Sequence, residues 1–314
     1  MIDSNRIVHG DALEVLKTFP SDCVQCVITS PPYYGLRDYG VDGQIGLEST
    51  PVEYVQKLVE VFREVRRVLK SDGTCWLNLG DSYTSHNDKQ VKPSGRTVRH
   101  VGMTESAPVR PPIVPHLGAK QLLGMPWRVA LALQDDGWYL RSDIIWSKPN
   151  PMPESVTDRP TKSHEYVFLL SKSERYYYDA DAIREPNTTK SNLREKRVEA
   201  YNNAYISPIG EGIREWNNPN GRNKRSVWSI ATHPYSEAHF ATMPTKLVEP
   251  CILAGSRPGD IVLDPFCGAG TTPLVALQYH RRYLGIELNP EYIALIEKRI
   301  AVVQPTLWSL EDAS

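Results

Sequence analysis

The sequence predicts an α/β fold in which a mainly parallel sheet is covered by helices on both faces. Two buried-type strands, residues 24–29 and 260–264, each run into a loop rich in proline or glycine. Amphipathic helical segments alternate with such strands along the chain, a pattern typical of parallel sheets. A chain of 314 residues fits one α/β core that carries insertions.

The amino-terminal part predicts a strand, a short helix and a second strand. Residues 6–11 form the first strand, and the helix begins at residues 12–16. Asp11 stands between them, where its side chain fits an N-cap. The second strand, residues 24–29, ends at Ser30-Pro31-Pro32-Tyr33, because two prolines cannot continue a ladder of hydrogen bonds.

The middle of the chain predicts a long helix and then further strands. Apolar residues recur three and four positions apart from Val55 to Leu69, and Asp72-Gly73 ends this helix. The other expected elements are a strand at 74–80, a helix at 127–133 closed by Asp136-Gly137, and strands at 139–146 and 165–171.

The carboxy-terminal part predicts a strand, a glycine turn and a helix start across residues 260–272. Gly268 and Gly270 let backbone N–H groups approach a ligand closely. Pro273 replaces the third glycine of the dinucleotide fingerprint, and no Gly-Lys-Ser/Thr of a phosphate loop follows. The next strand ends at Glu287, where a carboxylate binds ribose hydroxyls in nucleotide folds. This pair indicates an adenosine-bearing cofactor.

Ser30-Pro31-Pro32-Tyr33 suits methylation of an exocyclic base amine. Such an amine needs acceptors for its N–H bonds, which the Ser30 hydroxyl and the Pro31 carbonyl offer. The ring of Tyr33, rather than its hydroxyl, is expected to act, by stacking on a base turned out of the helix. The alternative is an ordinary Pro-Pro stop after a buried strand.

Together these residues resemble the amino-methylating DNA methyltransferases that use S-adenosylmethionine. The catalytic motif precedes the cofactor loop, which is the permuted order of that family's β group. The resemblance covers roughly residues 5–80, 120–180 and 238–302. It implies a Rossmann-like methyltransferase sheet with circularly permuted motif order, inserted target-recognition segments and S-adenosyl-L-methionine as cofactor.

The resemblance also implies roles for individual residues. Phe240 would pack on the cofactor, and Thr245 or Lys246 would meet its carboxylate, although a capped helix start explains any one of them equally well. The expected catalytic residues are Ser30, Pro31, Pro32 and Tyr33, and the expected cofactor-binding residues are Asp11, Phe240, Thr245, Lys246, Asp264, Pro265, Phe266, Gly268, Gly270, Thr271 and Glu287. No metal is expected to take part.

Positive charge is concentrated in two segments, although the whole chain has a net charge of −1. Residues 85–120 hold six basic and two acidic residues, and residues 184–225 hold nine basic and five acidic residues. Basic segments in an acidic chain favour contact with the phosphates of double-stranded DNA. The alternative is that both are solvated loops.

The division of the chain follows from these segments. We expect a first part of the catalytic core at 1–83, a basic insertion at 84–120, the core continued at 121–183, a target-recognition region at 184–236, the cofactor-binding part at 237–302 and a tail at 303–314.

The five cysteines, at 23, 26, 75, 251 and 267, show no regular spacing, so reduced thiols and a cytoplasmic location are expected. Cys23 and Cys26 have a zinc-knuckle gap but lie on a predicted strand, where positions three apart face opposite sides. Cys251 resembles a cytosine-C5 nucleophile, and a buried thiol is the ordinary interpretation. No apolar run is long enough to cross a membrane, and no secretory signal is evident.

The target base stays open between cytosine N4 and adenine N6. Family members with Ser-Pro-Pro-Tyr mostly methylate cytosine N4, so that base is favoured. Other interpretations are a non-catalytic DNA-binding module and an RNA or protein amine methyltransferase. The resemblance is also compatible with a homodimer and with a restriction endonuclease that acts separately on the same site.

Overall fold

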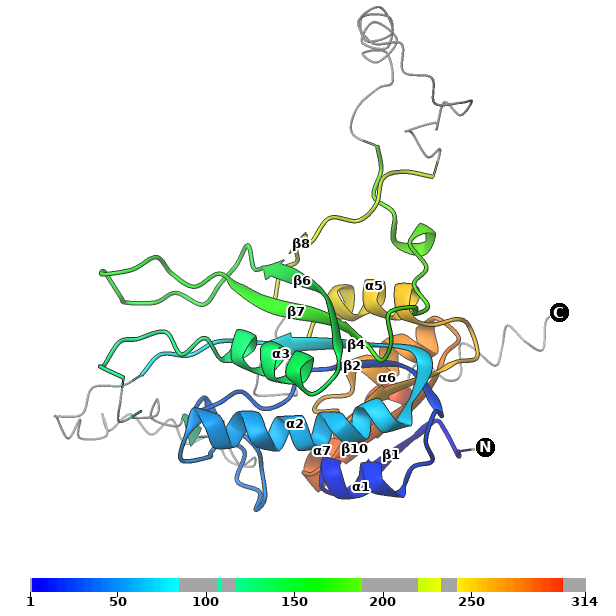
Figure 1. Cartoon of the computed structure of the whole chain (residues 1–314), viewed down its shortest axis with the longest axis horizontal. Coiled ribbons are helices and arrows are strands. Elements are labelled where there is room, and N and C mark those ends of the chain that lie inside the picture. Colours follow the sequence, from blue (N-terminus) through cyan, green and yellow to red (C-terminus); the bar gives the residue numbers. More distant parts are fainter. Residues whose placement is uncertain are drawn as a thin grey trace, which may run out of the picture.

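The computed structural model is built around one sheet, and it describes residues 2–84, 107–108, 114, 117–187, 220–232 and 242–301. Within these residues the sheet has eight strands in the order β1-β10-β9-β2-β4-β7-β6-β8 (Figure 1). Their bounds are β1 Arg6–His9, β2 Val24–Thr29, β4 Leu69–Leu79, β6 Tyr139–Ser147, β7 His164–Ser171, β8 Val227–Ser229, β9 Ile261–Asp264 and β10 Arg282–Glu287. A small second sheet pairs β3 (Arg37–Asp38) with β5 (Ala107–Pro108).

Strand β7 runs antiparallel to both its neighbours, β4 and β6, and the other pairs in the large sheet are parallel. Strand β2 lies between β9 and β4, and in its pairing with β9 Cys26 lies opposite Val262 and Val27 opposite Leu263. All six residues of β2 are buried, as expected of a parallel strand covered on both faces.

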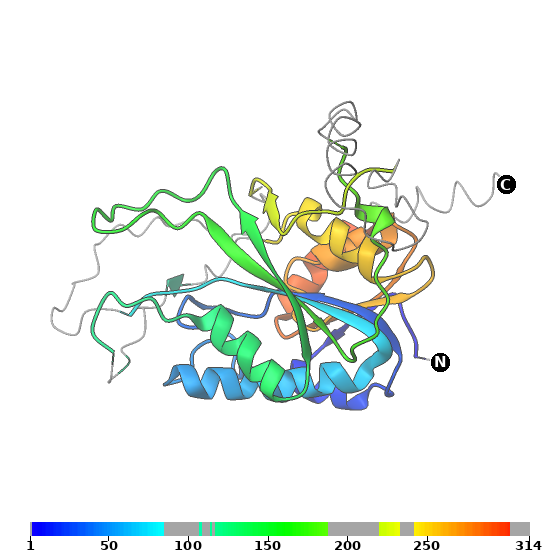
Figure 2. The same cartoon turned by 45° about the horizontal axis from the view of Figure 1, so that its top comes forward.

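Helices cover both faces of the sheet (Figure 2). On one face lie α1 (Ala12–Thr18), α2 (Pro51–Val68) and α3 (Met125–Asp135), and on the other lie α5 (Thr245–Gly255), α6 (Thr271–Gln278) and α7 (Pro290–Ala301). A short 3₁₀ helix, η1 (Asp181–Ile183), contacts α5. Two separate apolar clusters, one on each side of the sheet, form the core.

The longest helix, α2, shows how local sequence fixes an element. The side chain of Thr50 accepts a hydrogen bond from the Glu53 amide at 3.2 Å, and Pro51 occupies the first turn, so the amino end is capped and preset. Its inward side chains, among them Leu58 and Phe62, are fully buried against the sheet. The apolar spacing read from the sequence is therefore the face that holds α2 in place.

The predicted fold class is confirmed, and the differences concern boundaries. The first strand ends at His9, because Asp11 caps α1. The strand expected at 74–80 begins at Leu69, directly after α2. Cys251 is a buried thiol in α5. Most of the segments 84–120 and 184–236 lies outside the described residues, and β8, from the second segment, forms the sheet edge beside β6.

Among the described helices, none combines the length and the apolar character that crossing a membrane requires.

A glycine sets how closely α5 approaches the sheet. A Cβ at Gly255 would lie 2.7 Å from both Cys26 Sγ and Thr74 Oγ1. We expect Gly255→Ala to lower the free energy of unfolding by roughly 1–3 kcal/mol, because the core must shift to admit the methyl group. Urea unfolding of the variant would measure this loss. Gly118→Ala is the control, since a Cβ there meets only Gln121 Nε2, at 3.7 Å; equal losses in both variants would contradict the packing argument.

Candidate active site

The proline loop and the glycine loop, more than 200 residues apart in sequence, leave the sheet side by side. Ser30 follows β2 and Pro265 follows β9, and these strands are parallel neighbours. Thr29 Oγ1, at the end of β2, donates a hydrogen bond to Asp264 Oδ1, at the end of β9, at 2.7 Å, and Thr272 Oγ1, in the first turn of α6, donates to the Ile28 carbonyl of β2 at 3.3 Å. The carboxyl ends of parallel strands are where open α/β sheets bind ligands.

Asp264 anchors the glycine loop from inside. Its side chain is 1% exposed, and burial raises its pKa to about 6, against the hydrogen bonds from Thr29 and the Phe266 amide that favour the charged form. A buried carboxyl held by several donors fixes the backbone around it. In this structure Asp264 therefore acts on the shape of the loop.

The two glycines of the loop have different physical roles. Both have left-handed backbone angles, with φ of +52° at Gly268 and +75° at Gly270. A Cβ at Gly270 would lie 2.7 Å from Ile296 Cγ2, so this position keeps α7 packed on the loop. At Gly268 the nearest such neighbour is the Phe266 carbonyl oxygen, at 3.9 Å, so the space beside it is open. That open cradle fits a ligand that approaches the backbone closely.

Glu287 closes the cradle from the end of β10. Its Oε2 accepts the Gly268 amide at 2.7 Å, and its Oε1 accepts the Asn289 amide at 2.9 Å. Desolvation raises the pKa of this carboxyl to about 7, while the backbone donors oppose the rise. Each oxygen keeps acceptor capacity after these bonds, as hydroxyl recognition requires.

Asp11 follows the neighbouring strand β1 and is the N-cap of α1. His9 pairs with Glu287 in the sheet, and Asp11 follows two residues later. Asp11 Oδ1 accepts the Glu14 amide at 3.1 Å, so the N-cap interpretation is confirmed. Its second carboxyl oxygen makes the cofactor role compatible with capping, and that role stays a prediction.

The other expected cofactor residues are placed in three ways. Pro265 and Thr271 are buried beside the glycine loop, and Phe266 is half-buried. Thr245 and Lys246 are exposed in the first turn of α5, whose N-cap is Pro244. Phe240 lies outside the described residues.

The proline loop belongs to a polar network that the sequence did not reveal. Ser30 Oγ donates to Tyr33 Oη at 3.2 Å, and Tyr33 Oη donates to Glu165 Oε2 at 2.7 Å. Lys148 forms an ion pair with the other oxygen of Glu165. The side-chain amide nitrogen of Asn78 is 3.3 Å from Ser30 Oγ and 2.9 Å from Glu165 Oε2. Asn78 Oδ1 is buried and has no hydrogen-bond partner among the described residues.

Tyr33 is held by both its ring and its hydroxyl. A Cβ at Gly80 would lie 2.6 Å from Tyr33 Cε2, so the ring packs on bare backbone. Burial raises the pKa of the Tyr33 phenol well above its usual value, so the hydroxyl keeps its proton. The sequence directed attention to the ring, whereas the hydroxyl also has defined partners.

The network residues Asn78, Lys148 and Glu165 differ in whether the sequence marks them as candidates. Asn78 is a polar residue in an otherwise apolar strand, which is a signal that the sequence contained. Lys148 and Glu165 gave no such signal, because they meet only through the pairing of β6 with β7, where Ser147 lies opposite His164.

The cysteines occupy separate environments. Cys23 is half-buried and donates to the Pro20 carbonyl at 3.0 Å, whereas Cys26 is inside the core. Burial raises the pKa of the Cys26 thiol to about 12, so it stays protonated. The part of the chain that the structure describes contains no group of three or more His, Cys, Asp or Glu side chains arranged to hold a metal.

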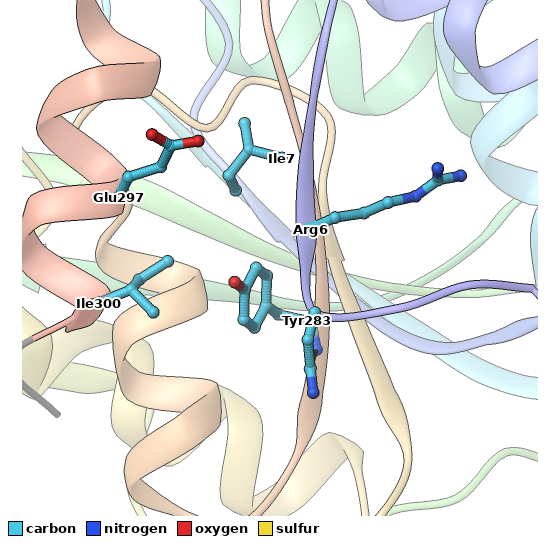
Figure 3. A pocket seen from close by; sticks show the side chains of 6 residues that line it. Arg6, Ile7, Tyr283, Glu297 and Ile300 are labelled. Atoms are coloured by element: carbon cyan, nitrogen blue, oxygen red, sulfur yellow. Dashed lines mark hydrogen bonds between the residues drawn. The ribbon is translucent and has the colours of Figure 1, made fainter. Parts of the chain in front are cut away.

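A hollow of about 270 Å³ lies elsewhere on the molecule (Figure 3). It is lined by Asn5, Arg6, Ile7, Tyr283, Glu297 and Ile300. These residues lie at the amino ends of β1 and β10 and on α7, at the opposite edge of the sheet from the two loops. We assign it no part in the site, since ligands of such sheets bind at the carboxyl ends.

Most basic residues expected to contact DNA lie outside the described residues. Most of those that are described have carboxylate partners in the same chain. Lys120 pairs with Asp158 at 2.7 Å, and Arg222 pairs with Glu185 at 3.2 Å. These basic side chains thus contribute to local structure, and the expectation of DNA contact stays a prediction.

Comparisons with known proteins agree on one family. The sequence model of a family described as DNA methylase matches residues 24–298. The Type II methyltransferase M.Cfr9I of Citrobacter freundii is 49% identical over 299 residues, which cover 95% of this chain and 88% of that protein.

Solved structures show the same fold. The PvuII DNA methyltransferase, described as cytosine-N4-specific, is 22% identical with a TM-score of 0.63, covering 95% of this chain and 87% of its own. TTHA0409 of Thermus thermophilus, solved in complex with S-adenosyl-L-methionine, is 24% identical with a TM-score of 0.59, covering 95% and 93%. The Rossmann-like methyltransferase sheet expected from the sequence is thereby confirmed.

The bond between the two strand ends can be tested by itself. We expect Thr29→Val to lower the free energy of unfolding by about 1–3 kcal/mol, because the buried Asp264 carboxyl loses a donor that valine cannot replace. Thermal unfolding would measure the change. Thr18→Val removes an exposed hydroxyl bonded to the Val15 carbonyl and serves as the control. Equal unfolding midpoints for both variants would show that this bond contributes little.

Proposed function

The chain belongs to the N6/N4 DNA methylase family, and we propose that it transfers a methyl group from S-adenosyl-L-methionine to the exocyclic amine of a base in double-stranded DNA. The observation that carries this proposal is the adjacency of the proline loop and the glycine loop on neighbouring strand ends. One loop offers acceptors for an amine, and the other offers an open backbone cradle for a cofactor. Methyl transfer needs both within reach of one another.

The cofactor supplies a methyl group activated on a cationic sulfonium when it is bound. The residues present fit it. Glu287 has acceptor capacity for ribose hydroxyls, and the open space beside Gly268 lets backbone approach closely. Asp11, Thr245 and Lys246 are proposed to hold its two ends, on the strength of the family resemblance.

The amine is handled by the proline loop. Ser30 Oγ and the Pro31 carbonyl are proposed to accept its two N–H bonds, which orients the nitrogen lone pair toward the methyl group. The Pro32 carbonyl is engaged by Tyr54 Oη at 2.9 Å, a bond that fixes the loop behind the acceptors. The Tyr33 ring is proposed to support the base.

We favour cytosine N4 as the target, because Ser30 stands where adenine-N6 enzymes of the family mostly have aspartate. Adenine N6 is the alternative, since the two amines have nearly the same local geometry. Target recognition is assigned to residues 184–236, which are rich in asparagine and arginine suited to reading base edges, and the positive charge of this segment and of the insertion at 84–120 is assigned to phosphate contact. The homodimer and the separate endonuclease are compatible with this proposal and add nothing to its chemistry.

Activity and target can be measured together. We expect the purified protein to incorporate tritiated methyl groups into duplex DNA, and mass spectrometry of the digested product to show N4-methylcytosine. Ser30→Ala should lower the rate by ~10²–10³, the usual effect of removing one oriented hydrogen-bond partner of the reacting group, while cofactor affinity is retained. N6-methyladenine in the digest would establish the alternative base. Transfer to RNA or protein but not to DNA would overturn the proposed substrate.

Cofactor affinity should depend on pH through Glu287. An ionised carboxylate can accept hydrogen bonds from ribose hydroxyls at both oxygens. Cofactor binding therefore favours the charged form and lowers the pKa of Glu287 from its value of about 7 in the cofactor-free protein. Affinity should therefore be nearly full at about pH 8, about half of that at pH 7 and about tenfold lower at pH 6, as proton linkage at one group requires. Calorimetry at pH 6, 7 and 8 would measure it. Glu287→Gln removes this titration, so the variant should bind the cofactor more weakly and with a flatter pH profile. Identical profiles would exclude Glu287 from the site.

A further inference from the structure

A chain of hydrogen bonds leads from the proline loop to a buried ion pair. It runs from Ser30 Oγ through Tyr33 Oη to Glu165 Oε2, with donor–acceptor distances of 3.2 Å and 2.7 Å. Lys148 Nζ pairs with the other carboxylate oxygen of Glu165. The side chains of Lys148 and Glu165 are 18% and 15% exposed, so water screens them little. The residues that follow β2 and β6 thus form one hydrogen-bonded chain with Glu165 of β7.

The ion pair determines which group donates and which accepts in each hydrogen bond of this chain. A carboxylate paired with an ammonium is ionised and can only accept hydrogen bonds, so Tyr33 must donate its proton to Glu165. The Lys148 ammonium also lies 4.4 Å from the centre of the Trp146 ring, which holds the cation in place. Once the phenol proton is committed, Tyr33 Oη can only accept from Ser30. The hydroxyl proton of Ser30 therefore points toward Tyr33 Oη.

Asn78 completes the pattern. Its side-chain amide nitrogen lies within hydrogen-bond distance of Tyr33 Oη, Glu165 Oε2 and Ser30 Oγ. An amide nitrogen only donates, so each oxygen that it meets acts as an acceptor there, and its two N–H bonds serve two of the three oxygens at a time. Ser30 Oγ has two lone pairs, of which Asn78 engages one at 3.3 Å. The other is left as an acceptor.

From this arrangement we propose that Glu165, paired with Lys148, is a positioning residue that orients Ser30 through Tyr33, so that Ser30 presents a lone pair to the amine of the target base. The inference rests on the proposed function. It assigns the Tyr33 hydroxyl a task beside that of its ring. It also explains why a hydroxyl, which is both donor and acceptor, acts here as an acceptor.

Glu165→Gln is the direct test, because glutamine has the same shape but can donate hydrogen bonds as well as accept them. The new amide group can donate to Tyr33 Oη, which frees the phenol to donate to Ser30 and turns the Ser30 proton toward the amine. We expect kcat to fall by about ten- to a hundredfold, a part of the effect of losing an oriented hydrogen-bond partner. The KM for DNA, the affinity for S-adenosylmethionine and the unfolding midpoint should stay unchanged. A merely structural role would instead move the midpoint or the KM.

Double variants show whether the effect passes through this chain. Tyr33→Phe keeps the ring and removes the link, so its kcat should fall to about the level of Glu165→Gln. Adding Glu165→Gln to Tyr33→Phe, or to Ser30→Ala, should then cause no further loss. If the kcat losses of the single variants multiply in the double variants, the proposal is wrong. Full activity in Tyr33→Phe would also overturn it, and that result does not require a Glu165 variant that folds.

Glu249→Gln is the matched control. Glu249 also accepts a hydrogen bond from a tyrosine hydroxyl, that of Tyr279, but this pair joins α5 to the end of α6. Its kcat should equal that of the unmodified protein. A wild-type protein that transfers no methyl group to DNA would refute the proposed function, whereas an active wild type with a fully active Glu165→Gln would refute this inference alone.

Discussion

The parallel pairing of β2 with β9 is the constraint on which the rest of the structure depends. These strands are separated by more than 200 residues, and only two residue pairs, Cys26 with Val262 and Val27 with Leu263, register them. The hydrogen bond from Thr29 to Asp264 then locks their ends. The positions of both loops depend on that register, so a shift of one strand would move Ser30 and Pro31 relative to Gly268 and Gly270. The permuted order of the motifs does not matter to the site, because adjacency in the sheet replaces adjacency in sequence.

Two carboxyl groups near this edge of the sheet lie in surroundings that disfavour their charge. Burial raises the pKa of Asp264 to about 6 and that of Glu287 to about 7. Each is offset in part by donors fixed in space, a hydroxyl and an amide for Asp264 and two backbone amides for Glu287. Donors that are preset by the loop need no reorganisation when a ligand arrives. The fixed donors that partly offset the desolvation of these carboxyl groups therefore also define the geometry of the loop.

The sequence contained the fold and both loops but not the network behind them. The types of the strands and helices could be predicted from the spacing of apolar residues. Ser30, Gly268 and Glu287 could be predicted as site candidates from short local motifs. Glu165 and Lys148 have no such local mark. They meet Tyr33 because β7 runs antiparallel between β4 and β6, and no local pattern in the sequence specifies that register. The hydrogen bonds of the Tyr33 hydroxyl could not be predicted for the same reason, since its partners come from β4 and β7.

The network also bears on the choice of serine at the end of β2. A carboxylate at that position would accept both N–H bonds of an amine in any orientation, because it has no proton to misdirect. A serine hydroxyl has one, and its value as an acceptor depends on where that proton points. Tyr33 and Glu165 can fix that proton because Glu165, which forms an ion pair with Lys148, accepts the hydrogen bond of the Tyr33 hydroxyl. In the proposed mechanism, the negative charge that an aspartate would place directly against the amine is held two hydrogen bonds away, on Glu165, where it orients Ser30 without meeting the base.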